Sequence, residues 1–167
     1  SIPETSGFII EIVKDFDDNI SDFYGDSSEI REALVNIILN SCDAMPSGGK
    51  LIFRTRALEE RILIEIEDTG VGMDEDVLSK CIEPFFTTKG DKGTGLGLSM
   101  VYGIIERHKG ELQINSIKGK GTTISILIPY NREVIEEKQI YSQINIPDNL
   151  EILYVEDDDT IIEVIKH

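Results

Sequence analysis

The sequence predicts an α+β domain over its first 130 residues. Two observations carry this prediction: two pairs of alternating apolar and polar segments have the pattern of β-hairpins, and two other segments have helix start and stop signals. Of the 167 residues, 40% are hydrophobic and 29% are charged, as in ordinary soluble globular proteins. This length suits one domain of average size and little more.

The first half of the domain reads as strand, helix and hairpin. Residues 9–14, with the sequence IIEIVK, predict a strand. Asp26 and Glu29 have the spacing of a capping box, which opens a helix that should run to about Met45. The sequence PSGG ends this helix, and segments 50–56 and 61–68 predict the strands of a first hairpin.

The second half repeats the order of helix and hairpin. Glycines are dense over residues 90–97, and a helix should follow through about His108, with Gly110 ending it. Segments 111–116 and 122–129 predict a second hairpin. We expect His108 to serve as a cation at the helix C-terminus rather than as a catalytic group.

Residues beyond 130 differ from this domain. Residues 131–149 are polar and charged without a clean period, which indicates a linker. Residues 150–167 hold an apolar strand, ILYV, and an acidic run, EDDD, and are too few to bury a core. They are expected to be the truncated start of a further domain.

The composition of the chain excludes some classes of partner and indicates a compartment. Asp and Glu number 32 against 16 Lys and Arg, a formal net charge of -16, which disfavours nucleic acid as a partner. No stretch is long and apolar enough to predict a membrane span or a signal peptide. The two cysteines, Cys42 and Cys81, do not indicate a disulfide scaffold, so we expect a reduced, cytoplasmic compartment, although the parent protein could be attached to a membrane.

The helix over residues 29–45 carries a polar stripe. On a helical wheel, a sector of roughly 80° holds Glu29, Glu32, Asn36, Asn40 and Asp43, with Arg31 as the clear exception outside it. Apolar residues occupy most of the other sides, so the stripe should line a cavity; a partly exposed helix with a hydrated strip is the alternative. Amide and carboxylate oxygens suit Mg²⁺, and no His/Cys cluster points to zinc.

Two glycine-rich segments follow. In DTGVGM, Asp68 stands at a strand end before two glycines, which lets a ligand ring approach the backbone; an ordinary turn is the alternative. In KGTGLGL, three glycines directly precede a helix and form an anion site, with local positive charge from Lys89 and Lys92. The alternative there is a glycine-rich loop without a ligand.

Together these elements resemble the catalytic ATP-binding domain of sensor histidine kinases, which shares the Bergerat fold with gyrase, Hsp90 and MutL-type ATPases. NIILNSCDAM is similar to the N box of that family, DTGVGM to its G1 box, EPFFTTK to its F box, GTGLGL to its G2 box and GKGTTISILIP to its closing G3 segment. The resemblance covers nearly all of residues 8–130, and the DAM and PFFTTK forms are most similar to the nitrogen-regulator-like branch. It implies a two-layer α/β sandwich with a mixed, mostly antiparallel sheet and helices on one face, and ATP and Mg²⁺ as cofactors.

The resemblance also implies roles for individual residues. Asn40, with Asn36, would hold Mg²⁺ on the triphosphate, and Asp68 would accept a hydrogen bond from the adenine amino group. The segment from Glu83 to Lys89 would begin a mobile lid, and Lys89 would reach phosphate. The expected catalytic residues are Lys89, Asn36 and Asn40. The remaining cofactor-binding residues would be Asp43, Gly70, Gly72, Met73, Phe85, Thr87, Thr88, Gly93, Thr94, Gly95, Leu96, Gly97, Leu98 and Thr122.

One position separates the branches of this superfamily. Its hydrolysing members carry a glutamate base four residues before the Mg²⁺ asparagine, where this chain has Asn36, which cannot take a proton. We therefore expect the site to hand the phosphoryl group to a protein acceptor, by positioning and electrostatic stabilisation. The alternatives are a free-standing ATPase of the same fold and a degenerate module used only for protein binding.

The resemblance also implies partners. The family's phosphoacceptor histidine lies on an upstream dimerisation domain, so this chain should bind ATP but not phosphorylate itself alone. ILYVEDDD resembles the first strand and acidic pair of a receiver domain, with Glu156 and Asp157 as the acids near its Mg²⁺. The expected partners are thus that histidine domain of the same protein and a receiver domain of the same or a partner protein, in a hybrid kinase of which this chain is a fragment.

Overall fold

A computed structural model describes residues 9–20, 23, 25–90 and 93–129. The expected linker over residues 131–149 and the expected receiver start over residues 150–167 lie outside these residues. The elements, in chain order, are β1 (Ile10–Asp15), α1 (Ser27–Asp43), β2 (Gly49–Ala57), β3 (Arg61–Asp68), α2 (Glu75–Lys80), α3 (Gly97–Arg107), β4 (Glu111–Ile117) and β5 (Gly121–Pro129).

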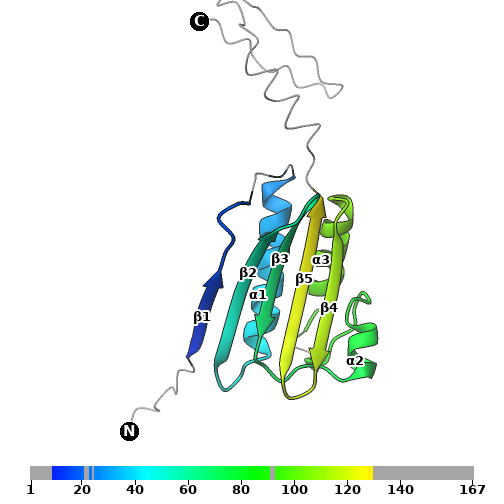
Figure 1. Cartoon of the computed structure of the whole chain (residues 1–167). Helices are drawn as coiled ribbons and strands as arrows, with labels where there is room; N and C mark the ends of the chain where they lie inside the picture. The colour runs from blue at the N-terminus through cyan, green and yellow to red at the C-terminus, as the bar shows by residue number, and fades with distance from the viewer. Residues whose placement is uncertain (1–8, 21–22, 24, 91–92, 130–167) are drawn as a thin grey trace, which may run out of the picture. The chain divides into compact units, whose positions relative to one another are not determined.

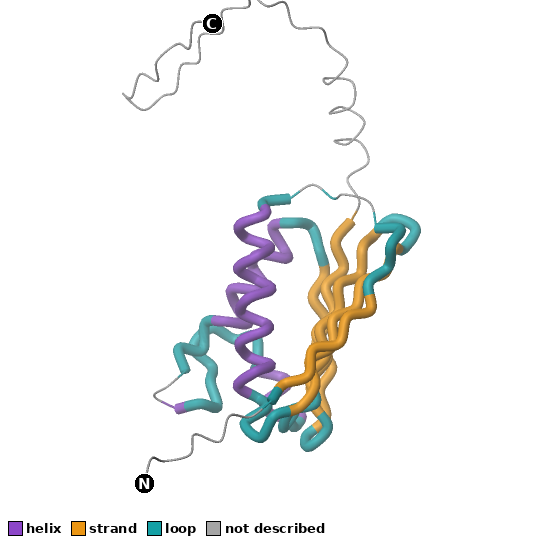
Figure 2. The backbone as a smooth tube through the Cα atoms, turned by 90° about the vertical axis from the view of Figure 1, so that its left-hand side faces the viewer, coloured by secondary structure: helices purple, strands orange, loops and turns teal. Residues whose placement is uncertain are grey.

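The five strands form one sheet in the order β1-β2-β3-β5-β4 (Figure 1). β1 runs parallel to β2, and the other neighbouring pairs are antiparallel. The helices lie on one side of the sheet (Figure 2), where α1 and α3 pack against each other and against the strands. The predicted fold class, a two-layer sandwich with a mixed, mostly antiparallel sheet, is therefore confirmed.

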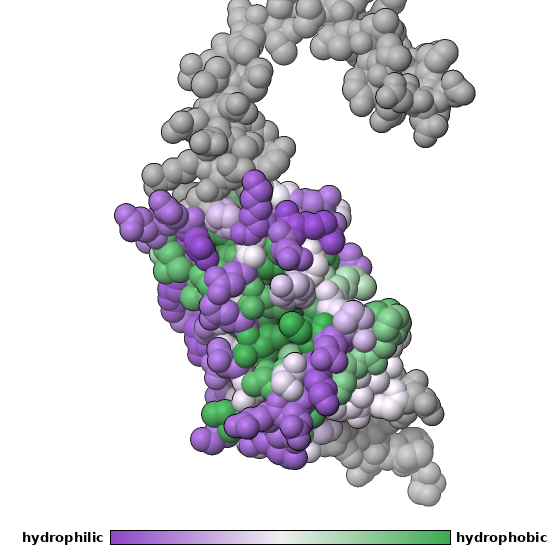
Figure 3. All heavy atoms as spheres, turned by 90° about the vertical axis from the view of Figure 1, so that its right-hand side faces the viewer, coloured by the Kyte–Doolittle hydropathy of each residue, from purple (hydrophilic) through white to green (hydrophobic). Residues whose placement is uncertain are grey.

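The core lies between the sheet and the two long helices. Successive side chains of a strand point to opposite faces, and the strands turn alternate isoleucines toward the helices. The largest fully buried side chains come from α1, α3, β3 and β5: Ile37, Ile62, Ile66, Val101, Ile104, Ile105, Ile126 and Ile128. Seen from the side of β4, apolar side chains reach the surface in a patch bordered by hydrophilic residues (Figure 3).

The start of α1 is capped, but differently from a complete capping box. The Asp26 carboxylate accepts hydrogen bonds from the N–H groups of Ser28 (2.8 Å) and Glu29 (3.1 Å), as the sequence predicts. The Glu29 side chain turns outward and pairs with Arg107 of α3 at 2.8 Å. The Asp26 N–H donates instead to Nε2 of His108 at 3.0 Å, so the helix start is tied to the end of α3.

His108 joins two helix ends. Its Nε2 accepts a hydrogen bond from the Asp26 N–H, and its Nδ1 lies 2.8 Å from the Ile104 carbonyl oxygen and 3.8 Å from Oε2 of Glu29. The side chain is only 7% exposed. The sequence predicts a cation at the helix C-terminus, and these contacts show in addition that His108 holds the start of α1 against the end of α3.

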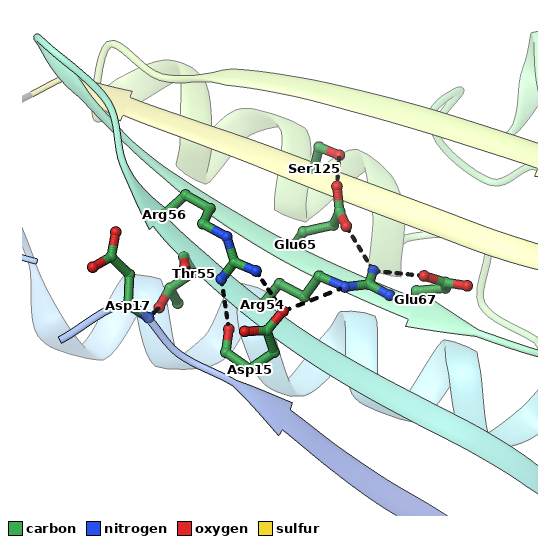
Figure 4. Close-up of polar contacts among 8 residues, drawn as sticks. All are labelled: Asp15, Asp17, Arg54, Thr55, Arg56, Glu65, Glu67 and Ser125. Carbon is green, nitrogen blue, oxygen red and sulfur yellow. Dashed lines mark hydrogen bonds and ion pairs between the residues drawn. The ribbon is translucent and has the colours of Figure 1, made fainter. Parts of the chain in front are cut away.

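The sheet face away from the helices carries ion pairs (Figure 4). Asp15, Arg54, Glu65 and Ser125 lie opposite one another in register across β1, β2, β3 and β5. Nη1 of Arg54 donates to Glu65 at 2.8 Å and to Glu67 at 2.6 Å. Charges of opposite sign thus cross the strands, and this face needs no helix to cover it.

Two further observations concern the helices. The short helix α2 is not among the elements expected from the sequence. Its N-cap is Asp74, whose carboxylate accepts a hydrogen bond from the Val77 N–H at 3.1 Å. In the described part of the chain, no helix combines the length and the apolar character needed to cross a membrane.

Candidate functional site

A cavity of about 560 Å³ lies on the helix side of the sheet. Its walls are α1, the end of β3, the start of β5, α2, the start of α3 and the loop before α3. Small-ligand sites in proteins have volumes of roughly 300–1,000 Å³, so this cavity has room for a nucleotide-sized molecule.

Asp68 forms the buried polar wall of the cavity. It is the last residue of β3, faces Thr122 of β5 in register, and is only 4% exposed. Its Oδ1 accepts hydrogen bonds from the N–H groups of Gly70 (2.8 Å) and Thr122 (3.3 Å). Because both of these donors use Oδ1, Oδ2 keeps its capacity to accept a hydrogen bond from a ligand.

The protonation of Asp68 reflects its burial. Desolvation raises the pKa of this carboxyl above its usual value, and the Gly70 N–H, the nearby Ser41 hydroxyl and the Thr122 N–H offset part of that effect. No cationic side chain is among these groups. A carboxylate held by neutral donors in a buried wall attracts a ligand N–H more strongly than one already paired with a cation.

Gly72 lets the backbone pass close to the second hairpin. It has φ of 62°, and a Cβ there would collide with the carbonyl oxygen of Ile117. Only glycine adopts this conformation without strain and also leaves the space free. Gly72 and the following Met73 line the cavity, as expected, whereas Gly70 does not line it and contributes its N–H to Asp68.

Three residues of the polar stripe on α1, namely Asn36, Asn40 and Asp43, line the cavity. Glu29 and Glu32, near the start of the helix, do not line it. The helix is less buried than its apolar residues predict, since Val35 is 46% exposed and Leu39 58% exposed.

Lys89 contacts the end of this stripe. Its Nζ lies 2.6 Å from Oδ2 of Asp43 and 3.2 Å from Oδ1 of Asn40. Both side chains of the Lys89–Asp43 pair are substantially exposed, so water screens it. The Lys89 ammonium group thus lies between an amide oxygen and a carboxylate oxygen of the stripe.

The loop before α3 closes the other end of the cavity. Gly95 has φ of 66°, and a Cβ there would collide with the backbone of Phe85, whose N–H donates to the Gly95 carbonyl at 2.9 Å. Phe85 itself has φ of 68°, a strained conformation for an aromatic residue. Its side chain is 76% exposed and does not line the cavity, although the sequence predicts a cofactor contact there.

The structure brings the remaining predicted residues together. Thr87, Thr88, Gly93, Thr94, Leu96, Gly97, Leu98 and Thr122 all line the same cavity. Lys92, which the sequence offers as further positive charge, lies outside the described residues.

Sequence reasoning missed other lining residues. Leu39, Ser41, Ala44, Val71, Val77, Cys81, Phe86, Met100 and Ile124 also contribute to the walls. For Val77 and Cys81 a signal exists, because Asp74 followed by two acidic residues is typical of a helix start and predicts α2. For Ser41 there is none, since it lies among the apolar residues of α1 and only the fold places it near Asp68.

The donor set of the stripe fits a hard cation. Asn36 donates from Nδ2 to the Glu32 carbonyl at 3.0 Å, which leaves its Oδ1 as a possible ligand beside that of Asn40. Within the described ranges, no three His, Cys, Asp or Glu side chains gather as a metal cluster. A cation here would therefore take few protein oxygens and need the oxygens of a phosphate or of water, which suits Mg²⁺.

Comparisons with known proteins show which family the chain belongs to. The model of the family of histidine kinase-, DNA gyrase B- and HSP90-like ATPases matches residues 25–132. Sporulation kinase E of Bacillus subtilis (strain 168) is 38% identical over 130 residues, which cover 77% of this chain and 18% of that protein. Sensor kinase CckA of Brucella abortus (strain 2308) is 38% identical over 161 residues, covering 81% of this chain and 17% of that protein. The chain thus spans less than a fifth of the length of these relatives.

Solved structures show the same similarity. The mycobacterial sensor histidine kinase MprB matches with a TM-score of 0.64 and 27% identity, over 72% of this chain and 81% of that one. The catalytic domain of the histidine kinase ThkA has a TM-score of 0.64 and 28% identity, over 72% of this chain and 78% of that one. Full-length ShkA, solved in complex with AMPPNP, shares the fold with a TM-score of 0.65 at 24% identity, over 72% of this chain and 26% of that one.

Proposed function

Because the chain belongs to the family of histidine kinase-, DNA gyrase B- and HSP90-like ATPases, we propose that it binds Mg·ATP in the cavity described above and donates the γ-phosphoryl group to a histidine on a separate domain. The chain carries the ATP-binding catalytic domain of a two-component sensor histidine kinase. The roles of the individual residues, the metal and the phosphate acceptor are the proposal.

The observation that carries this proposal is the arrangement of one cavity. A buried carboxylate, Asp68, lies in one wall, and the glycine-rich residues 93–97 line another, next to the N-terminus of α3. The adenine amino group donates a hydrogen bond, which suits Asp68, and the phosphates accept hydrogen bonds, which suits the loop and the helix dipole.

Asn36 and Asn40 hold Mg²⁺ in this proposal, with Asp43 near enough to contribute charge. When bound, Mg²⁺ neutralises the negative charge that the phosphate oxygens develop. Lys89, which now contacts Asn40 and Asp43, then turns to the phosphates. The contact of this ammonium group with Asn40 and Asp43 supports a preference of this end of the stripe for positive charge.

Asn36 makes ATP hydrolysis slow. It stands where the hydrolysing relatives carry a glutamate, and its amide cannot take a proton from water. The described domain therefore contributes binding, orientation and electrostatic stabilisation, while the nucleophile comes from the histidine domain.

Two finer assignments belong to the same proposal. The forms DAM and PFFTTK support a place in the nitrogen-regulator-like branch of the kinases. The sequence ILYVEDDD supports a receiver domain that begins near residue 150, with Glu156 and Asp157 as its acidic pair. The domain boundaries at residues 130 and 149 are part of this second assignment.

Titration with Mg·ATP tests the proposal against a module that only binds protein. A fluorescent adenine nucleotide should bind the chain, and ATP with Mg²⁺ should displace it. Lack of binding by the wild-type chain would refute the nucleotide site, and Ser125→Ala, on the other face of the sheet, is the control that should bind as the wild type does.

Steady-state hydrolysis separates a kinase domain from a free-standing ATPase. Phosphate release should stay near background with the wild-type chain, and Asn36→Glu should increase it because a base is restored. Labelled ATP should transfer its γ-phosphate when a histidine dimerisation domain is added. Rapid hydrolysis by the wild type without an acceptor would favour the ATPase.

A further inference from the structure

Cys81 brings a thiol to the wall of the cavity. It is the C-cap residue of α2, is only 9% exposed, and lines the same cavity as Asp68. Val77, four positions earlier, also lines the cavity, and residues four apart share one face of a helix. The face of α2 that carries both residues is therefore turned toward the cavity.

Independent features of the cavity point to a ligand beside this thiol. The volume of about 560 Å³ suits a small molecule. The Asp68 side chain lines the cavity and is only 4% exposed. Its Oδ2 keeps the capacity to accept a hydrogen bond, because the Gly70 and Thr122 N–H groups both use Oδ1. A molecule held there shares one enclosed space with the Cys81 thiol.

The surroundings of Cys81 do not activate its thiol. Burial raises the pKa of the Cys81 thiol, so the protonated form, which is a poor nucleophile, predominates at neutral pH. The thiol is free rather than part of a disulfide. Reaction at this sulfur therefore depends on a reagent that enters the cavity and stays close to it.

We propose that Cys81 is a site of covalent modification by small, uncharged α,β-unsaturated carbonyl compounds, and that the resulting adduct excludes a nucleotide from the cavity. The modification rests on the cavity alone, whereas the exclusion of a nucleotide rests on the proposed function. In the reaction, the thiol gives its proton to water, and the sulfur forms a bond to the β-carbon of the reagent. The carbon–carbon π bond breaks, and the α-carbon takes a proton from water. The product is a thioether, and no oxidant or reductant is needed.

The walls near Cys81 favour this class of reagent. Val77, Phe86 and Ile124 line the cavity with apolar side chains, which suit an uncharged ring. The ionised Asp68 carboxylate disfavours an anionic reagent, because like charges repel more strongly where water is excluded. A maleimide is uncharged, small and an α,β-unsaturated carbonyl compound, so it is the probe of choice.

Cys42 provides a matched control within the same chain. It lies on α1, is partly buried and does not line the cavity. The sequence contains no third cysteine. Cys42→Ser and Cys81→Ser therefore each retain a single thiol, and the labelling of each variant reports on one site alone.

Treatment of the full chain with N-ethylmaleimide, followed by intact-protein mass spectrometry, tests the modification. The folded Cys42→Ser variant should gain one adduct, at a rate that does not rise with urea below the unfolding transition, because access through the cavity needs no global unfolding. Mg·ATP at about ten times its dissociation constant should slow this labelling about tenfold, since only about one cavity in eleven is then empty. The labelling of Cys42 in Cys81→Ser should change by less than about twofold under the same conditions.

The effect of the adduct on nucleotide binding is the second measurement. After complete labelling, Cys42→Ser should bind a fluorescent adenine nucleotide at least about tenfold more weakly than before treatment. Cys81→Ser should bind the nucleotide equally well before and after treatment with the maleimide. Thermal unfolding of each labelled protein shows whether it is still folded.

The outcomes separate the modification from the function. The absence of an adduct at Cys81 in the folded protein, or a labelling rate that follows global unfolding, would overturn the modification site. Equal labelling with and without a nucleotide that binds, or an adduct that leaves nucleotide affinity unchanged, would overturn the exclusion. If the fluorescent nucleotide does not bind the untreated protein, the proposed function fails, whereas an adduct at Cys81 in the folded protein still supports the modification site.

Discussion

The two faces of the sheet shift the pKa of a carboxyl group in opposite directions. On the outer face, the side-chain hydrogen bond from Arg56 is the main cause that lowers the pKa of Asp15, and Arg54 pairs with Glu65 and Glu67. On the inner face, burial raises the pKa of Asp68, whose partners are neutral donors. Glu67 and Asp68 are consecutive residues of β3, so one step along a strand separates the two environments.

The carboxylates of the two faces differ in what they contribute to the free energy of unfolding. Exposed ion pairs lie in water with partners of opposite charge, and each contributes little to the free energy of unfolding. A buried carboxylate without a cationic partner costs free energy in the folded state. Such an unfavourable contribution to stability is consistent with a residue whose role is to bind a ligand.

The largest effect is expected for Asn40, which we propose to hold Mg²⁺ on the triphosphate. Asn40→Ala should reduce Mg·ATP affinity or phosphoryl transfer by about 100-fold or more, the scale of one preorganised electrostatic group. The thermal midpoint without ligand should stay close to that of the wild type, because the side chain contacts only Lys89 among the hydrogen bonds described. Wild-type binding of Mg·ATP by this variant would refute the metal assignment.

Asp68→Asn should separate binding from stability. The loss of a hydrogen bond to a charged acceptor costs about 1.5–3 kcal/mol, so ATP affinity should fall about 10- to 100-fold. The preference for ATP over GTP, expected to be at least about tenfold in the wild type, should shrink, because the amide can offer guanine a donor. Competition of both nucleotides for a fluorescent probe measures this, and equal displacement from the wild type would show that Asp68 does not read the base.

The same variant should be more stable than the wild type without ligand at neutral pH. The raised pKa means that the folded state binds the Asp68 proton more tightly than the unfolded state does. At a pH above the pKa of Asp68 in the folded protein, the ionised carboxylate therefore destabilises the fold. At a pH below the pKa of Asp68 in the unfolded protein, this effect disappears. Thermal unfolding of both proteins from about pH 7 to about pH 4 should show the advantage of Asn shrinking as the pH falls; a wild type that is more stable at pH 7 would contradict this sign.

Lys89→Ala should give a smaller effect, because Lys89 forms an exposed pair. We expect ATP affinity to fall about 3- to 10-fold, with a weaker dependence on salt, since one positive charge is lost near the phosphates. Titrations at low and high salt measure both quantities. An unchanged salt dependence would show that Lys89 does not reach the phosphates.

The smallest effect is expected on the outer face. Arg54→Met removes a guanidinium that contacts two carboxylates, and should lower the free energy of unfolding by about 1 kcal/mol or less. ATP affinity should not change. Denaturant unfolding and the nucleotide titration test both statements, and a loss of affinity in this variant would mean that the two faces are coupled.

The alternation of apolar and polar residues along the strands made most of the fold predictable. Both hairpins and both long helices begin and end within two residues of their expected positions. The period of two also assigns Ile62 and Ile66 to the core and Glu65 to the outer face, because the register of a hairpin fixes which side chains share a face. The parallel pairing of β1 with β2 has no such local signal, and the family resemblance implied only that the sheet is mixed.

The site was predictable where a local motif constrains the backbone. The glycines before α3 and Asn36 and Asn40, one helical turn apart, lie around one cavity as expected. Phe85 was not predictable from its motif alone, since a positive φ turns its side chain away from the cavity. His108 depended on a contact with Asp26, 82 positions away, which no local pattern reveals.

The pairing of β3 with β5 has a kinetic consequence. Residues 69–120 separate these neighbours, so the two hairpins can form from local contacts while the β3–β5 junction requires closure of a long loop. Asp68 and Thr122 come from opposite sides of this junction, and the wall of the cavity that they form together does not exist until it has closed. A nucleotide bound there stabilises contacts that form late, so we expect it to slow unfolding of the domain while leaving the rate of refolding nearly unchanged.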